Sequence, residues 1–104
     1  MAIINITADD IKRNVHALAS KHDNIKHVYL VGSYSQGKNT LYSDIDLVIE
    51  FFDNYDNETY WGFLFGMEKE TSRGVNLLTM EAVQNSPLRD GILNSRILIY
   101  TKSE

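Results

Sequence analysis

The chain of 104 residues contains no cysteine, one proline and one tryptophan. Without cysteine it can form neither disulfide bonds nor a thiolate zinc site. No run approaches the roughly 18 apolar residues of a membrane-spanning helix, and the N-terminal MAIINITADDIKRN lacks the basic and then apolar segments of a signal peptide. By elimination we expect a cytoplasmic protein that does not contact a membrane.

Positive charge is also scarce. Ten Lys and Arg against 14 Asp and Glu give a net charge of -4, which argues against binding along a nucleic-acid backbone. A metal ion can still bring a triphosphate to an acidic site, so the charge does not exclude a nucleotide. The apolar content of 43% is that of a globular protein, and the length predicts a single domain over residues 1–104.

The sequence pattern alternates between helices and strands. A first helix begins at Thr7 as N-cap, and the second strand becomes apolar on both faces after Asp46, which is typical of a central strand. The elements, in order, are a helix from Thr7 with the apolar face Ile11, Val15, Leu18 and His22, a strand at 27–31, a polar turn-rich segment at 33–43, a strand at 45–49, a polar loop at 53–57, a helix at 58–72 ending near Gly74, a strand at 75–79, short helices at 80–85 and 88–93, and a strand at 96–100. This order predicts an α/β fold with a small mixed sheet flanked by helices.

The segment VGSYSQGKNTLYSDIDLVIEF carries the strongest functional pattern. Gly32 and Ser33 follow an apolar strand, and Asp44 and Asp46 open the next strand. Alternate strand residues share a face, so the two carboxylates should project together about 6–7 Å apart. Such a pair can hold Mg²⁺ ions about 3.5–4 Å apart, which activate an attacking hydroxyl and neutralise a leaving pyrophosphate. Gly32 has no side chain to keep backbone amides from a phosphate.

Two serines add polar groups to this pattern. The Ser33 hydroxyl is a donor at the phosphate turn, and Ser43 can either orient Asp44 or cap its own turn. Gly-Ser turns and Asp-x-Asp pairs are each common by chance. Their combination in two successive strands favours metal-assisted binding of a nucleoside triphosphate.

GSYSQGKNTLYSDIDL resembles the Gly-Ser-x10-Asp-x-Asp signature of the DNA polymerase β-like nucleotidyltransferase superfamily, and the short chain with VIEF is similar to its minimal nucleotidyltransferase (MNT) branch. GVNLLT also has a counterpart there, so the resemblance covers nearly the whole chain. It implies a nucleotidyltransferase-like fold, with ATP and two Mg²⁺ ions held by Gly32, Ser33, Asp44 and Asp46. Many minimal members are antitoxins encoded beside a helical HEPN ribonuclease toxin. Some silence that toxin by transferring AMP to one of its tyrosines.

Two positions depart from the family pattern. Asn76 stands where the family usually has an Asp that ligates the metal and accepts a proton, and an amide can offer a weak oxygen ligand but cannot act as a base. Glu50, about 13 Å beyond Asp46 along the strand, is too far to replace that Asp. Gln36 stands where Arg is frequent, and Lys38 is the cation that can take its place at the nucleotide.

Two hypotheses therefore remain open. The first is an MNT-type antitoxin that binds Mg-ATP and transfers AMP to a hydroxyl of a HEPN-type partner through Asp44, Asp46 and Asn76. The second is a weakened or inactive relative that neutralises its partner by binding alone. Transfer to a small molecule such as an aminoglycoside is less favoured, because 104 residues leave no room for a substrate-capturing domain. The same size argument predicts that a second chain encloses the base and positions the acceptor.

The aromatic segment 60–65 allows two interpretations. Its side chains would surround a helix, so one core face cannot bury all of them. They either form a helix end tucked under a loop or a surface for another subunit, which leaves a homo-oligomer open. His16, His22 and His27 do not have the spacing of metal ligands.

Overall fold

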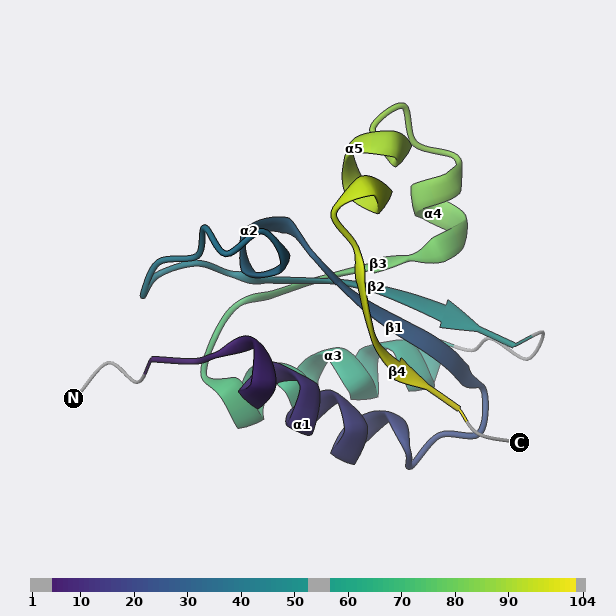
Figure 1. The fold of residues 1–104 in the computed structure, drawn as a ribbon. Helices are drawn as coiled ribbons and strands as arrows, with labels where there is room; N and C mark the ends of the chain where they lie inside the picture. Colours follow the sequence, from purple (N-terminus) through teal and green to yellow (C-terminus); the bar gives the residue numbers. More distant parts are fainter. Residues whose placement is uncertain (1–4, 53–56, 103–104) are drawn as a thin grey trace.

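The computed structural model describes residues 5–52 and 57–102. The elements are α1 (Ala8–Ala19), β1 (Ile25–Val31), α2 (Gly32–Ser35), β2 (Ile45–Phe51), α3 (Asn57–Thr71), β3 (Val75–Thr79), α4 (Met80–Gln84), α5 (Arg89–Asn94) and β4 (Ile97–Thr101) (Figure 1). The predicted α/β fold is confirmed. Apart from Asn57, the polar loop predicted at 53–57 lies outside the described residues. In the described part of the chain no helix is long and apolar enough to cross a membrane.

The described residues form a mixed four-stranded sheet in the order β3-β2-β1-β4. β1 pairs antiparallel with β2 and β4, whereas β2 and β3 run parallel. β2 is thus an internal strand, and its residues Leu47 and Val48 are both fully buried although they point to opposite faces. The prediction of a central strand covered on both faces is confirmed.

The two faces of the sheet are covered by different helices. α1 and α3 pack on one face, and α4 and α5 lie on the other (Figure 1). Ile45, Leu47 and Ile49 of β2 belong to the larger core beneath α1 and α3. Val48 belongs to a smaller core with Val83 of α4. Because Asp46 alternates with Leu47, it points to the α4–α5 side.

Some predicted boundaries are wrong. The segment predicted as a polar loop at 33–43 begins with the short helix α2, and β1 starts at Ile25, two residues early. α1 ends at Ala19, so His22 lies beyond the helix face to which it was assigned. α3 ends at Thr71, and the left-handed residue after it is Ser72 (φ 54°) instead of Gly74. Single residues at helix ends are decided by local bonds that apolar periodicity does not report.

The N-terminus of α1 is closed by a reciprocal pair of hydrogen bonds. Thr7 Oγ1 accepts from the Asp10 backbone N–H at 3.1 Å, and Asp10 Oδ2 accepts from the Thr7 N–H at 2.9 Å. This capping box satisfies N–H groups that have no partner inside the helix. The bond from the Thr7 backbone is the main cause that holds the pKa of Asp10 below its usual value, followed by the bond from the Thr7 hydroxyl.

Asp10→Asn is therefore expected to lower the free energy of unfolding in a pH-dependent way. The folded-state pKa of Asp10 is depressed, so its stabilising effect is present above the unfolded pKa and is lost as the pH falls through the folded pKa. Urea unfolding at neutral pH should separate the variant from wild type, and the two curves should converge in acid. Asp9→Asn, in the same helical turn, is the control for charge alone. A difference that persists in acid would contradict the capping argument.

Candidate functional site

Asp46 is held between β1 and β3 on the α4–α5 face of the sheet. Its backbone pairs with Val31 on one side and with Asn76 on the other. The Asn76 Nδ2 donates a hydrogen bond of 2.8 Å to Asp46 Oδ1. The other carboxylate oxygen, Oδ2, lies directly against Gly32, at the place where a Cβ would stand on any other residue. The carboxylate is thus fixed by contacts on both sides.

Asp44 lies one alternation earlier and is exposed. Its Oδ1 would stand 2.8 Å from a Cβ built on Gly74, the residue before β3. Gly74 and Asn76 alternate along the same face, so both carboxylates lie beside β3. Neither Asp44 nor Asp46 forms a salt bridge within the described residues. Their charges therefore remain available to a cation.

Gly32 connects β1 to α2 in a backbone conformation that favours glycine, with φ +72°. Two requirements meet at this residue, because positive φ and the contact with Asp46 both disfavour a side chain. Ser33 follows in α2 and is half-buried. Within the described residues its carbonyl accepts from the Lys38 N–H at 2.9 Å, while no hydrogen bond uses its hydroxyl.

The other predicted nucleotide contacts lie farther out. The Ser43 hydroxyl accepts from the Thr40 N–H at 2.8 Å, so it caps its own turn, one of its two predicted roles. Lys38 is exposed and does not line the pocket at Asp46. Glu50 does not approach Asn76, because it pairs with His27 Nδ1 at 2.8 Å.

A pocket of about 450 Å³ opens at Asp46, a volume in the range of small-molecule sites. Its polar floor is formed by Asp46 and Asn76 beside Gly32. Its opposite wall is apolar and comes from α5 and the turn before it. The lining residues are Val31, Gly32, Gln36, Asp46, Asn76, Leu78, Pro87, Leu88, Gly91, Ile92 and Ser95. The polar groups therefore lie together at one end of the cavity, and the wall opposite them is hydrophobic.

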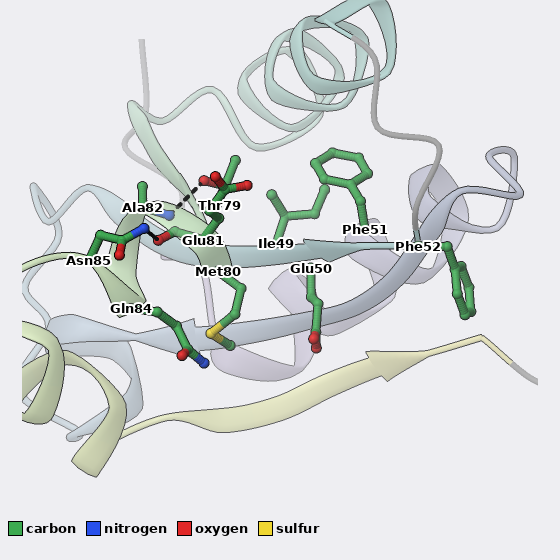
Figure 2. A pocket seen from close by; sticks show the side chains of 10 residues that line it. All are labelled: Ile49, Glu50, Phe51, Phe52, Thr79, Met80, Glu81, Ala82, Gln84 and Asn85. Carbon is green, nitrogen blue, oxygen red and sulfur yellow. Dashed lines mark hydrogen bonds between the residues drawn. The ribbon is translucent and has the colours of Figure 1, made fainter.

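A second and larger hollow, of about 860 Å³, lies at the other end of β2. Figure 2 shows its lining side chains, which come from the end of β2 and the residue after it, from Thr79 at the end of β3, and from α4 and the residue after it. Its polar groups are partly engaged, since the Asn85 Nδ2 donates to the Glu81 carbonyl at 3.0 Å. None of the predicted site residues lines it. We therefore place the candidate site at Asp46, where the smaller pocket meets the conformationally restricted Gly32.

The donor set at Asp46 fits one hard cation better than two. Mg²⁺ prefers oxygen ligands and is commonly held by one or two carboxylates together with substrate phosphates. Asp44 and Asp46 can provide the two carboxylates. Within residues 5–52 and 57–102 no three His, Cys, Asp or Glu side chains gather as ligands. Asn76 leaves a two-carboxylate site with a neutral third group.

Two features of the site were missed in the sequence. The apolar wall from Leu88 and Ile92 could have been found, because these residues are four apart after Pro87 and so share one side of a short helix. Gly74 was interpreted as a helix end, whereas its small size allows the Asp44 carboxylate to approach β3. No local pattern reports a contact between residues 30 positions apart.

Gly32→Ala should destabilise the protein more than Gly37→Ala. Both residues have positive φ, near +70°, so both variants carry the left-handed penalty of about 1–2 kcal/mol. Only at Gly32 would the methyl group overlap Asp46, whereas nothing lies within 4 Å of a Cβ on Gly37. Overpacking should add about 1–3 kcal/mol. Chemical unfolding measures the difference, and equal losses would show that the Asp46 carboxylate moves aside without cost.

Comparisons with known proteins identify the chain's family. The sequence profile of the family described as "Polymerase beta, Nucleotidyltransferase" matches residues 13–104. A protein of Methanocaldococcus jannaschii named "Putative protein adenylyltransferase MJ1379" is 31% identical over 77 residues, which cover 72% of this chain and 77% of that protein. A second protein of the same organism and type, MJ0435, is 27% identical over 89 residues, covering 86% and 94% of the two chains.

Solved structures agree with this assignment at the level of the fold. A crystal structure of a toxin–antitoxin complex with AMP-PNP matches with a TM-score of 0.69 and 21% identity, covering 88% of this chain and 74% of that one. A structure of the tri-AMPylated Shewanella oneidensis HEPN toxin in complex with MNT antitoxin matches with a TM-score of 0.63 and 18% identity, covering 88% and 71%. The chain therefore belongs to the polymerase β nucleotidyltransferase family.

Proposed function

We propose that the chain is a minimal nucleotidyltransferase-type antitoxin that transfers AMP from Mg-ATP to a hydroxyl of a HEPN-type toxin. The observation that carries the proposal is the Asp46 carboxylate, which lies between Gly32 and Asn76 at the polar end of a pocket. Relatives named as protein adenylyltransferases and structural neighbours that are toxin–antitoxin complexes support it.

The chain's own residues suit distinct parts of the reaction. Asp44 and Asp46 would hold Mg²⁺, which when bound offsets the charge of the triphosphate and of the leaving pyrophosphate. Gly32 and Ser33 would receive the phosphates, and the apolar α5 wall suits the face of a purine base. The partner's hydroxyl oxygen bonds to the α-phosphorus as the bond to pyrophosphate breaks. Asn76 cannot take the hydroxyl proton, so Asp46, beside it, is the group placed to accept it.

The pocket is too open to position an acceptor hydroxyl by itself. Its apolar side comes from α5, a helix of six residues, and the polar end with Asp46 is only half-buried. Water must be excluded before a phosphoryl group is transferred efficiently to a chosen hydroxyl. A second chain that covers the pocket would both exclude water and present the acceptor, which is why the proposal includes a protein partner.

One observation favours binding without catalysis as the second candidate. The Asn76 amide N–H donates to Asp46 Oδ1, and so it occupies a carboxylate oxygen that a catalytic metal would use. An inactive relative that neutralises its toxin by contact alone would keep this arrangement.

Transfer of label from [α-³²P]ATP distinguishes the candidates. The chain, Mg²⁺, the labelled ATP and the product of the adjacent gene are incubated and separated by gel. Label on the partner, dependent on Mg²⁺, is the expected result. A tight complex without label would favour the binding-only relative. Label on free aminoglycosides, in a parallel screen of acceptors, would move the acceptor to small molecules.

A further inference from the structure

The outer surface of α3 carries large aromatic side chains that the fold does not bury. Trp61 and Phe65 are 49% and 59% exposed and stack on each other with ring centroids 5.7 Å apart. On the opposite side of the same helix, Phe63 and Met67 are fully buried. α3 thus has an inner face that packs on the sheet and an outer face with its own apolar contact surface.

Gly62 lies on this outer face, and no contact within the described part of the chain accounts for a glycine there. A glycine within a helix costs about 1 kcal/mol relative to alanine. At Gly66 this cost has a visible reason, because Leu18 of α1 packs 3.0 Å from where a Cβ would stand. At Gly62 nothing lies within 4 Å of that position. The notch beside Trp61 therefore faces outward, where another molecule could enter it.

Opposite charges flank the aromatic pair. Glu58 lies in the first turn of α3 and Lys69 in the last, both exposed. Their positions in the sequence place them on the same side of the helix as Phe65, about 16 Å apart along the axis. Neither forms a salt bridge with a described residue.

We infer that this outer face of α3, comprising Glu58, Trp61, Gly62, Phe65 and Lys69, binds the same face of a second copy of the chain. The two helices would cross antiparallel about a two-fold axis that passes between the two outer faces, level with position 63 along each helix.

The arrangement of the face is self-complementary. Trp61 and Phe65 are placed evenly about Phe63, so across the axis Trp61 of one copy meets Phe65 of the other. The midpoint between Glu58 and Lys69 differs by half a residue, about 0.8 Å, so each acid meets a lysine. Such reciprocal contacts are the requirement of a two-fold interface. A parallel pairing would place Glu58 against Glu58 and is disfavoured by the repulsion of like charges.

The proposed dimer leaves the candidate site open. α3 packs on the larger core, on the face of the sheet opposite to Asp46. The two pockets of the dimer would point away from each other, each free to take a nucleotide and an acceptor. A single helix pair buries less area than a standard stable interface, so the dimer should be concentration-dependent.

Sedimentation velocity at low ionic strength, over an approximately hundredfold range of concentration, tests the inference. We expect a monomer–dimer equilibrium. The emission of Trp61, the chain's one tryptophan, should shift to the blue as the dimer forms. A monomer at every concentration would overturn the inference. So would a Trp61 shift that appears only when a different protein is added, because it would assign the face to that partner.

Charge reversal tests the pairing. Glu58→Lys and Lys69→Glu should each weaken dimerisation about tenfold, because each change replaces attraction by repulsion at two symmetric places. The double variant should recover most of the wild-type affinity. Glu70→Lys is the matched control, because Glu70 is an exposed residue of α3 that does not belong to this outer face. Single variants without effect, or a double variant without recovery, would overturn the antiparallel arrangement.

Gly62→Ala separates the interface from the stability of the helix. The substitution should raise the melting temperature of the monomer, because it removes a mid-helix glycine. It should also weaken dimerisation, because the methyl group fills the notch beside Trp61 within the proposed interface. A variant that is more stable and dimerises as well as wild type would show that the notch is not part of the interface.

Discussion

Asp46→Asn is expected to lower the rate of AMP transfer by at least about 10²-fold, because a metal-centred phosphoryl transfer loses its main anionic ligand. The folded protein should be almost unchanged. An asparagine has nearly the same shape, and its carbonyl oxygen can accept the hydrogen bond that Asn76 now donates to Asp46 Oδ1. Label transfer to the partner measures the rate, and thermal unfolding shows that the fold is retained.

Asp90→Asn is the matched control for this experiment. Asp90 lies on α5, the helix that forms the apolar wall, but does not line the pocket itself. The substitution removes the same charge and should leave transfer within a factor of about two. Transfer by Asp46→Asn at close to the wild-type rate would mean that the metal is held elsewhere, and the proposed chemistry at this pocket would be wrong.

Asn76→Asp should make the protein's stability depend on Mg²⁺. The substitution replaces a 2.8 Å hydrogen bond by two carboxylates at close range. Without metal, the lost bond and the repulsion should cost about 1–2 kcal/mol, or about 5–10 °C in melting temperature for a chain of this size. Mg²⁺ should restore the loss, because the site then offers three carboxylates. The transfer rate should rise, since the third position gains a base.

Asn76→Ala separates the two components of this effect. It removes the hydrogen bond without adding a charge, so its stability should be lowered less and should respond to Mg²⁺ no more than wild type does. Melting curves in EDTA and in Mg²⁺ give the comparison. An Asn76→Asp protein that melts at the same temperature in both would show that the side chain at 76 does not share a cation with Asp46. An unchanged or lower transfer rate would show that the third strand does not limit catalysis.

The order of the elements was predictable because each long segment has the hydrophobic periodicity of either a helix or a strand. β2 has apolar residues on both sides after Asp46, which is the pattern of an internal strand, and the structure places it between β1 and β3. The start of α1 was predictable from Thr7, because helix capping depends only on residues close in sequence. The family followed from the Gly-Ser and Asp-x-Asp motifs within one continuous stretch of 15 residues, Gly32 to Asp46.

The features that were not predicted depend on contacts distant in sequence. α2 has only four residues, fewer than periodicity can detect. The role of Gly74 depends on the position of Asp44, which is set by the parallel pairing of β2 and β3. The hydrogen bond between Asn76 and Asp46 likewise needs the register of that pair. The sequence showed that Asn76 stands in place of a base. It did not show that the Asn76 amide donates a hydrogen bond to the neighbouring carboxylate.

The crossover from β2 through α3 to β3 places the outer surface of α3 and the candidate site on opposite faces of the sheet. α3 runs on one side of the sheet while Asp44, Asp46 and Asn76 lie on the other, so substitutions on the outer helix surface and in the pocket share no neighbours. Their effects on stability should therefore add. A substitution that changes what binds to α3 should therefore leave the chemistry at the carboxylates unaltered, and a substitution at the carboxylates should leave binding to α3 unaltered.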